Sequence, residues 1–159
     1  MSTALWRIAT DTPDYTATDM GGTGAKLTGG RWNRQGWPVI YAASSIALAC
    51  LETVVHLNTS GLPLNRYLVR LDVPPAIWKK ARKLNLDKSS IGWDALPAGR
   101  VSLDIGERWL AEGDSALFLV PSIVIPEEFN VLVNPAHPDA RHIRVEKLRK
   151  FTYDARLYP

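Results

Sequence analysis

Residues 26–57 read KLTGGRWNRQGWPVIYAASSIALACLETVVHL, a succession of loop, strand and helix. Six glycines crowd the segment 19–36, which predicts a long loop whose backbone can pass close to another group. Loops of that length in a small domain are often functional. The apolar run at 39–41 then predicts a short buried strand.

The helix that follows is predicted to begin at Ser44 or Ser45 and to continue to about Leu57. At about 100° per residue, apolar side chains cover most of its circumference, so we predict a mostly buried helix. One narrow strip carries the remaining side chains: Ala49, Glu52, Thr53 and His56. Because an unpaired buried carboxylate is very costly, Glu52 must face solvent or a polar cleft. An exposed Glu52 that pairs with His56 at i+4 is the other interpretation.

The rest of the chain is rich in predicted strands. Alternating apolar side chains predict a half-buried strand at 66–73, and proline follows it directly. The other predicted elements are strands at 116–120 and 129–133, a strand or hairpin at 143–157, a helix at 101–112 and a partly helical segment at 78–86. Strands outnumber helices without alternating with them. The pattern therefore favours an α+β fold, one compact domain over residues 1–159 with a central, mostly antiparallel sheet.

Composition fits one cytoplasmic domain. The chain has 159 residues, of which 46% are hydrophobic, enough for one sizeable core. No run of apolar residues is long enough for a membrane helix or a secretory signal, so we expect a soluble, cytoplasmic protein. One cysteine and three histidines offer no zinc-ligand spacing, and we expect no metal.

Positive charge is concentrated at the C-terminus. The net charge is only +3, yet residues 141–159 hold six Lys or Arg side chains against two carboxylates. Such a patch can attract nucleic acid or an acidic partner, although a solvated basic face is the commoner interpretation. Charge alone does not predict nucleic-acid binding.

Several polar residues are candidates for a site. Arg31 lies in the glycine-rich segment, where its guanidinium and nearby backbone N–H groups suit an anion such as phosphate. Lys26 and Arg7 can add positive charge, but GGRWN is neither a Walker loop nor a dinucleotide fingerprint. Tyr41 is more often a core aromatic than a stacking platform. Ser122 is a candidate turn residue, since it lacks the elbow motif of a serine nucleophile.

Together these residues resemble the RES domain, the toxin half of the Xre-RES type of bacterial toxin–antitoxin pair. The matching stretches are WRI at 6–8, GGRWN at 29–33, VIYA at 39–42, LETVVH at 51–56, VPS at 120–122, FN at 129–130 and NPAHP at 134–138. The arginine, glutamate and serine that name the family fall on Arg31, Glu52 and Ser122. The segment 75–114 carries no motif of the family.

The resemblance implies a fold like that of ADP-ribosyltransferase toxins of the diphtheria type, and an enzyme that consumes NAD+. Members cleave the bond between nicotinamide and ribose, and the acceptor is a protein side chain, water or phosphate. The sequence does not choose among these acceptors. The implied partner is an Xre-like helix-turn-helix antitoxin that covers the active site, so that any DNA contact belongs mainly to the antitoxin.

Each candidate then acquires an expected role. Arg31, with Arg7 and Lys26 nearby, would hold the phosphates or the adjoining ribose, and Tyr41 would stack on nicotinamide or ribose. Glu52 would bind the ribose hydroxyls and stabilise positive charge, as carboxylates do in glycoside cleavage. Ser122 would bind the carboxamide or a ribose hydroxyl, and His56 would steady Glu52.

Two other functions stay open at this point. Arg31, Glu52 and His56 have the chemistry of a metal-free ribonuclease. A non-catalytic basic binding module, dominated by the C-terminal Lys and Arg residues, is the third possibility.

Overall fold

The computed structural model describes residues 1–57 and 61–157, and in that part of the chain seven strands form one sheet. The strands are β1 (Thr3–Ala9), β2 (Ile40–Ala43), β3 (Tyr67–Val73), β4 (Arg82–Lys83), β5 (Leu117–Pro121), β6 (Phe129–Val133) and β7 (Arg144–Lys150). Their order is β4-β5-β6-β2-β1-β3-β7, and every neighbouring pair is antiparallel except β4 and β5. The predicted α+β fold with a mostly antiparallel sheet is confirmed.

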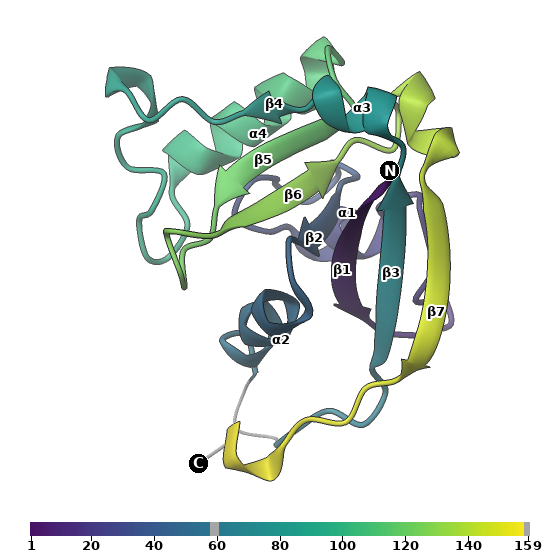
Figure 1. The fold of residues 1–159 in the computed structure, drawn as a ribbon. Helices are drawn as coiled ribbons and strands as arrows, with labels where there is room; N and C mark the ends of the chain where they lie inside the picture. The colour runs from purple at the N-terminus through teal and green to yellow at the C-terminus, as the bar shows by residue number, and fades with distance from the viewer. Residues whose placement is uncertain (58–60, 158–159) are drawn as a thin grey trace.

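The sheet changes direction where β2 meets β1. These two strands share a single register pair, Trp6 with Ala43, whereas β1 and β3 pair along seven residues. In Figure 1, β1, β3 and β7 consequently run across the direction of β5 and β6. The side chains of β1 and β2 near this junction can therefore face a common space.

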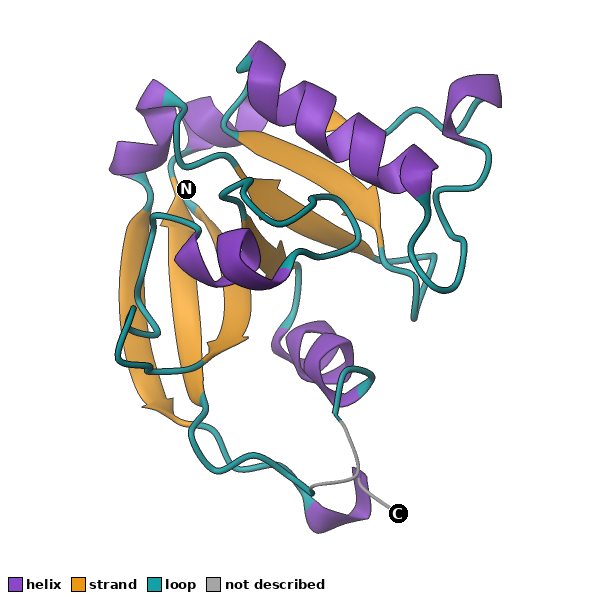
Figure 2. Ribbon diagram, turned by 180° about the vertical axis from the view of Figure 1, so that it is seen from behind, coloured by secondary structure: helices purple, strands orange, loops and turns teal. Residues whose placement is uncertain are grey.

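Four α-helices accompany the sheet in the described residues: α1 (Thr23–Thr28), α2 (Ile46–Val54), α3 (Pro75–Lys79) and α4 (Arg100–Glu112). Helix α4 lies along β5, as Figure 2 shows, and buries Trp109 against Phe118 with ring centroids 5.3 Å apart. Helix α2 lies at the open side of the bend and packs Leu48 and Ala49 with Ile8. No helix in the described residues combines the length and the apolar character needed to cross a membrane.

Most predicted elements are confirmed within a residue or two. The strands predicted at 39–41, 66–73, 116–120 and 129–133 are β2, β3, β5 and β6, and the helix predicted at 101–112 is α4. At 143–157 the structure has a strand, β7, and no hairpin. The segment 78–86 holds the end of α3 and the two-residue strand β4. Strand β1 was not predicted, because its residues do not alternate in polarity.

The long loop predicted at 19–36 is wrong in part, because it contains α1. Asp19 accepts hydrogen bonds from the backbone N–H groups of Gly21 and Thr23, at 3.2 and 3.0 Å, and so stabilises the start of this helix from outside it. Gly22 precedes the helix with φ of 70°, and a Cβ there would lie 2.5 Å from the Val39 nitrogen. The glycine content reflects close backbone packing here, rather than a loop alone.

Helix α2 is shorter and less buried than predicted. Ser45 caps it by accepting from the Leu48 N–H at 3.1 Å, as expected, but the helix ends at Val54. Only Leu48 and Ala49 are buried, and the Val55 side chain that follows is 51% exposed. The helix meets the sheet on one side only, so its other apolar side chains stay partly open to solvent.

Candidate active site

A cavity of about 400 Å³ lies at the bend of the sheet. Its walls come from six parts of the chain: β1, the segment 15–30 with α1, β2, α2, β6 and Arg66, which directly precedes β3. The polar side chains that matter most are Arg7 from β1, Tyr41 from β2, Glu52 from α2 and Asn130 from β6. Sequence positions more than 120 residues apart therefore meet in one site.

The carboxylate of Glu52 is held by two hydrogen bonds to the same oxygen. The Ser122 hydroxyl donates to Oε1 at 2.5 Å, and the Asn130 side-chain amide donates to Oε1 at 2.8 Å. The described residues make no hydrogen bond to Oε2. Of the two predicted alternatives, solvent or a polar cleft, Glu52 faces a polar cleft, since it lines the cavity. Its Oε2 atom can still accept a hydrogen bond there.

Ser122 reaches the cavity only through Glu52. It follows directly on β5, is fully buried, and does not line the cavity. Its oxygen accepts from the backbone N–H groups of Val124 and Ile125, both at 3.1 Å. With both lone pairs of the oxygen accepting these bonds, the hydroxyl proton is directed to the Glu52 carboxylate. The hydroxyl therefore has no hydrogen-bonding capacity left for a ligand.

Arg7 places a guanidinium in the cavity wall. Its Nε atom is buried and has no hydrogen-bond partner among the described residues. Burial lowers the pKa of Arg7, while the nearby Asp19 and Tyr15 act in the opposite direction. An unpartnered buried N–H of a cation is costly, and an anionic ligand in the cavity would satisfy it.

Tyr41 links the cavity to the segment 29–37, which we call the arginine loop. Its hydroxyl donates to Asn33 Oδ1 at 2.5 Å and accepts from the Trp32 backbone N–H at 3.1 Å. Burial raises the pKa of Tyr41 well above its usual range, so the hydroxyl stays protonated. A Cβ at Gly30 would lie 2.7 Å from this hydroxyl, so glycine lets the loop pass directly against the ring.

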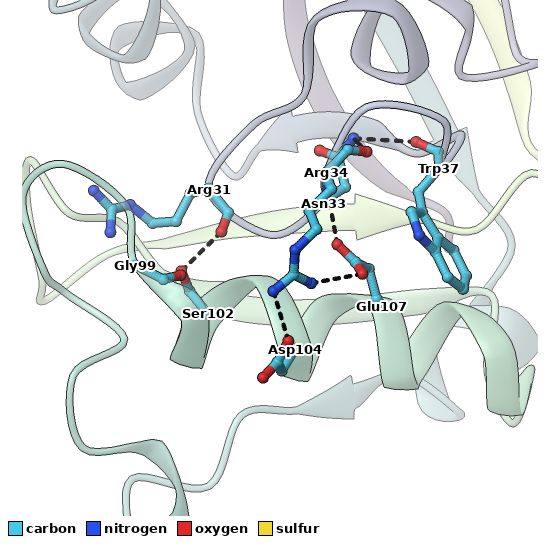
Figure 3. A network of polar contacts seen from close by, with 8 residues as sticks. All are labelled: Arg31, Asn33, Arg34, Trp37, Gly99, Ser102, Asp104 and Glu107. Atoms are coloured by element: carbon cyan, nitrogen blue, oxygen red, sulfur yellow. Dashed lines mark hydrogen bonds and ion pairs between the residues drawn. The ribbon is translucent and has the colours of Figure 1, made fainter.

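Arg31 lies beside the cavity and does not line it. Its Nη1 donates to the backbone carbonyls of Trp93 and Ala95, at 2.9 and 2.8 Å. Burial lowers the pKa of Arg31, and the negative charges of Asp94 and Glu52 oppose this shift. In Figure 3 its guanidinium extends away from Arg34 and the rest of the network. The carbonyls occupy one end of the guanidinium and leave the other N–H groups for a ligand.

The remaining candidates divide between the wall and the surface. His56 lines the cavity and is exposed, but no hydrogen bond or ion pair joins it to Glu52 in the described residues. Lys26 is exposed on α1 and is not part of the wall. Within residues 1–57 and 61–157, no three His, Cys, Asp or Glu side chains cluster as metal ligands would.

Two asparagines that contact candidate site residues were not named as candidates from the sequence. Asn130 contacts Glu52 because β6 pairs with β2, where Asn130 lies opposite Ala43. Asn33 is fully buried, and its side-chain amide also donates to the carbonyls of Ala25, Arg34 and Trp37. Only the strand pairing and the loop conformation give these residues their roles, and neither is visible in the residue pattern.

The model of the RES-domain family matches residues 4–155 of this chain. The chain belongs to the RES-domain family. The resemblance drawn from Arg31, Glu52, Ser122 and the stretches around them is therefore confirmed.

Curated relatives of this RES domain are named as toxins. It is 56% identical over 157 residues to the Prs ADP-ribosylating toxin of Sphingobium sp. (strain YBL2), covering 99% of this chain and 98% of the relative. It is 35% identical over 144 residues to the Toxin Res of Photorhabdus laumondii, with 90% of each chain covered. With the Toxin Res of Pseudomonas putida the identity is 34% over 156 residues, 97% of this chain and 99% of the relative. The name of the first relative supports the expected resemblance to ADP-ribosyltransferase toxins.

Proposed function

We propose that this RES domain is an NAD+-consuming toxin that binds NAD+ in the cavity and cleaves its nicotinamide–ribose bond. The observation that carries the proposal is the presence of a carboxylate and a guanidinium in the wall of one cavity. The Glu52 carboxylate, fixed through one oxygen, faces the same space as Arg7, whose buried Nε has no hydrogen-bond partner among the described residues. The ADP-ribosylating activity in the name of the Sphingobium relative supports the same chemistry.

The reaction needs a negative charge close to the ribose. When the bond from ribose C1′ to nicotinamide breaks, its electron pair leaves with nicotinamide, which becomes neutral. Positive charge then develops on C1′ and the ring oxygen, and the Glu52 carboxylate stabilises it while Oε2 accepts from a ribose hydroxyl. The acceptor forms the new bond to C1′ with its own lone pair and releases its proton to solvent or to Glu52.

The other side chains hold the substrate or the carboxylate. Arg7 binds the diphosphate from within the cavity, and Arg31 reaches it from beside the cavity with the N–H groups that its two carbonyls leave free. The ring of Tyr41 contacts nicotinamide or ribose. Ser122 acts by positioning Glu52, a different role from the direct substrate contact expected from the family resemblance.

The family also suggests a biological role. An Xre-like helix-turn-helix antitoxin would cover the cavity and carry any DNA contact, and the uninhibited toxin would stop growth in the cytoplasm by consuming NAD+. The acceptor of ADP-ribose would be a target protein, water or phosphate.

Mass spectrometry of NAD+ tests the proposal. Purified protein is incubated with NAD+, inorganic phosphate and cell extract, and in parallel with labelled RNA. We expect NAD+ to disappear with release of one nicotinamide per ADP-ribose, and the second product identifies the acceptor. If NAD+ stays intact and the RNA is cleaved, the proposal is wrong and the ribonuclease interpretation takes its place.

Replacement of Arg31 by alanine tests the phosphate contact. We expect Arg31→Ala to weaken NAD+ binding about tenfold or more, because a hydrogen bond to a charged group contributes about 1.5–3 kcal/mol. Isothermal titration calorimetry measures this affinity. Arg82→Ala is the matched control, since Arg82 is exposed and pairs with Glu112, the last residue of α4. Equal affinities of the two variants for NAD+ would mean that Arg31 does not bind the phosphates and that Arg7 is the remaining candidate.

A further inference from the structure

Helix α4 holds the arginine loop through the carboxylate of Glu107. Oε2 accepts from the backbone N–H of Arg34 at 2.7 Å, and Oε1 accepts from Nη1 of the same residue at 2.8 Å. Figure 3 shows both bonds, with Arg34 extending from the loop onto the helix. One carboxylate therefore fixes both the main chain and the side chain of a single loop residue.

Glu107 is the shielded half of this contact. Its side chain is 13% exposed, whereas Asp104, which accepts from Nη2 of Arg34 at 2.8 Å, is 48% exposed. Exposed ion pairs contribute little because water and salt screen them, and a shielded carboxylate with two charge-assisted bonds contributes more. Of the two acidic residues, Glu107 is the one expected to fix the loop.

Two further contacts join α4 to the same loop. The Ser102 hydroxyl donates to the Arg31 carbonyl at 2.8 Å, and Gly106 packs against the backbone of Trp32. Arg31, Trp32 and Arg34 are thus all attached to one face of α4. On the other side, Tyr41 holds Asn33 and the Trp32 N–H. The loop has little freedom to move Arg31 relative to the cavity while these contacts persist.

We propose that Glu107 is a positioning residue for NAD+, which keeps the arginine loop, and with it Arg31, in place beside the cavity. The proposal rests on the proposed function for its substrate. It gives a role to the segment 75–114, which carries no motif of the family but supplies α4 and also the two carbonyls that orient Arg31. Glu107 itself does not line the cavity.

Glu107→Gln tests the proposal, with Glu112→Gln as the matched control. Both residues lie on α4 and bind an arginine, but Glu112 binds Arg82, away from the loop. We expect Glu107→Gln to raise the KM for NAD+ by up to about tenfold, the effect expected for loss of the Arg31 side chain, with kcat changed less than the KM. Displacement of Arg31 would weaken its charge-assisted bond to NAD+, which is binding that the ground and transition states share. Glu112→Gln should keep both constants.

Hydrogen exchange gives a readout that does not depend on NAD+. In Glu107→Gln the amides of residues 30–37, and that of Arg34 above all, should exchange faster while those of β5 and β6 stay unchanged. Wild-type exchange in the arginine loop together with a wild-type KM would overturn the proposal. A uniform rise in exchange with an unchanged KM would do so too, because it would mean that Glu107 only stabilises the fold.

The outcomes also separate this proposal from the proposed function. If the wild-type protein does not consume NAD+ and Glu107→Gln nevertheless speeds exchange only in the arginine loop, NAD+ is not the substrate. Glu107 would then still be the residue that positions the loop. If Glu107→Gln does not fold, Arg34→Ala replaces it, because that side chain is 43% exposed and its removal keeps the bond from the backbone N–H. We expect a smaller rise in KM for this variant, and an unchanged KM would count against the proposal.

Discussion

Glu52→Gln is expected to lower the turnover of NAD+ by about 100-fold or more while it leaves the fold and NAD+ binding nearly intact. The substitution keeps the size of the side chain and an oxygen that can still accept from Ser122 and Asn130. It removes the negative charge that stabilises the cationic ribose. Because that charge acts mainly in the transition state, kcat should fall much more than affinity.

The measurement combines NAD+ consumption with calorimetry on the same protein. Glu127→Gln is a suitable control, since Glu127 is exposed and lies in the connection between β5 and β6. We expect this control to match the wild type in both assays. Near-normal NAD+ consumption by Glu52→Gln would show that the carboxylate does not carry the chemistry, whatever its contacts.

Local patterns predicted the parts of the site that lie on regular elements. The helical strip with Glu52 and His56 was visible because α2 follows a 3.6-residue period, and in the structure both side chains line the cavity. The same pattern overestimated the burial of α2. Periodicity shows which residues share a face of a helix, but it does not show how many of its faces pack against other elements. Ile46 and Val55 stay exposed for that reason.

Contacts between distant segments could not be predicted from one sequence. Asn130 reaches Glu52 only because β6 pairs with β2, and Arg7 enters the wall only because β1 joins the sheet at the bend. The role expected for Ser122 also needed the fold, since its burial and its three hydrogen bonds turn the hydroxyl inward. Family resemblance named Arg7 and Ser122 as candidates but not Asn130, and the structure supplies the contacts that Ser122 and Asn130 make with Glu52.

The arginine loop shows a further limit of composition. Its glycines predicted a long loop that passes close to another group, but composition did not indicate that the loop is held on both sides, by α4 and by Tyr41. Gly30 is needed because the Tyr41 ring leaves no room for a side chain. Glycine in this segment therefore permits close packing, and the closest contact of this kind involves a glycine on the helix, Gly106.

Gly106→Ala is expected to destabilise the protein, although alanine is normally better in a helix by about 1 kcal/mol. Gly106 is buried in the middle of α4, and a Cβ there would lie 1.9 Å from the carbonyl oxygen of Trp32 and 2.8 Å from its Cβ. The backbone of the arginine loop would have to move away from the helix. Overpacking of this kind costs about 1–3 kcal/mol and sometimes more, which outweighs the gain in helix propensity.

Thermal unfolding followed by circular dichroism measures the effect, with Gly99→Ser as the control. Gly99 begins the same helix, and a Cβ there meets only the Ala95 side chain at 3.6 Å, an ordinary contact. Gly106→Ala should lower Tm by about 5 °C, since 1 kcal/mol corresponds to about 2–4 °C in a domain of this size. Gly99→Ser should leave Tm unchanged or raise it, because serine is a favoured N-cap. A higher Tm for Gly106→Ala would mean that the loop can leave α4 freely, which would also remove the basis for assigning Glu107 a positioning role.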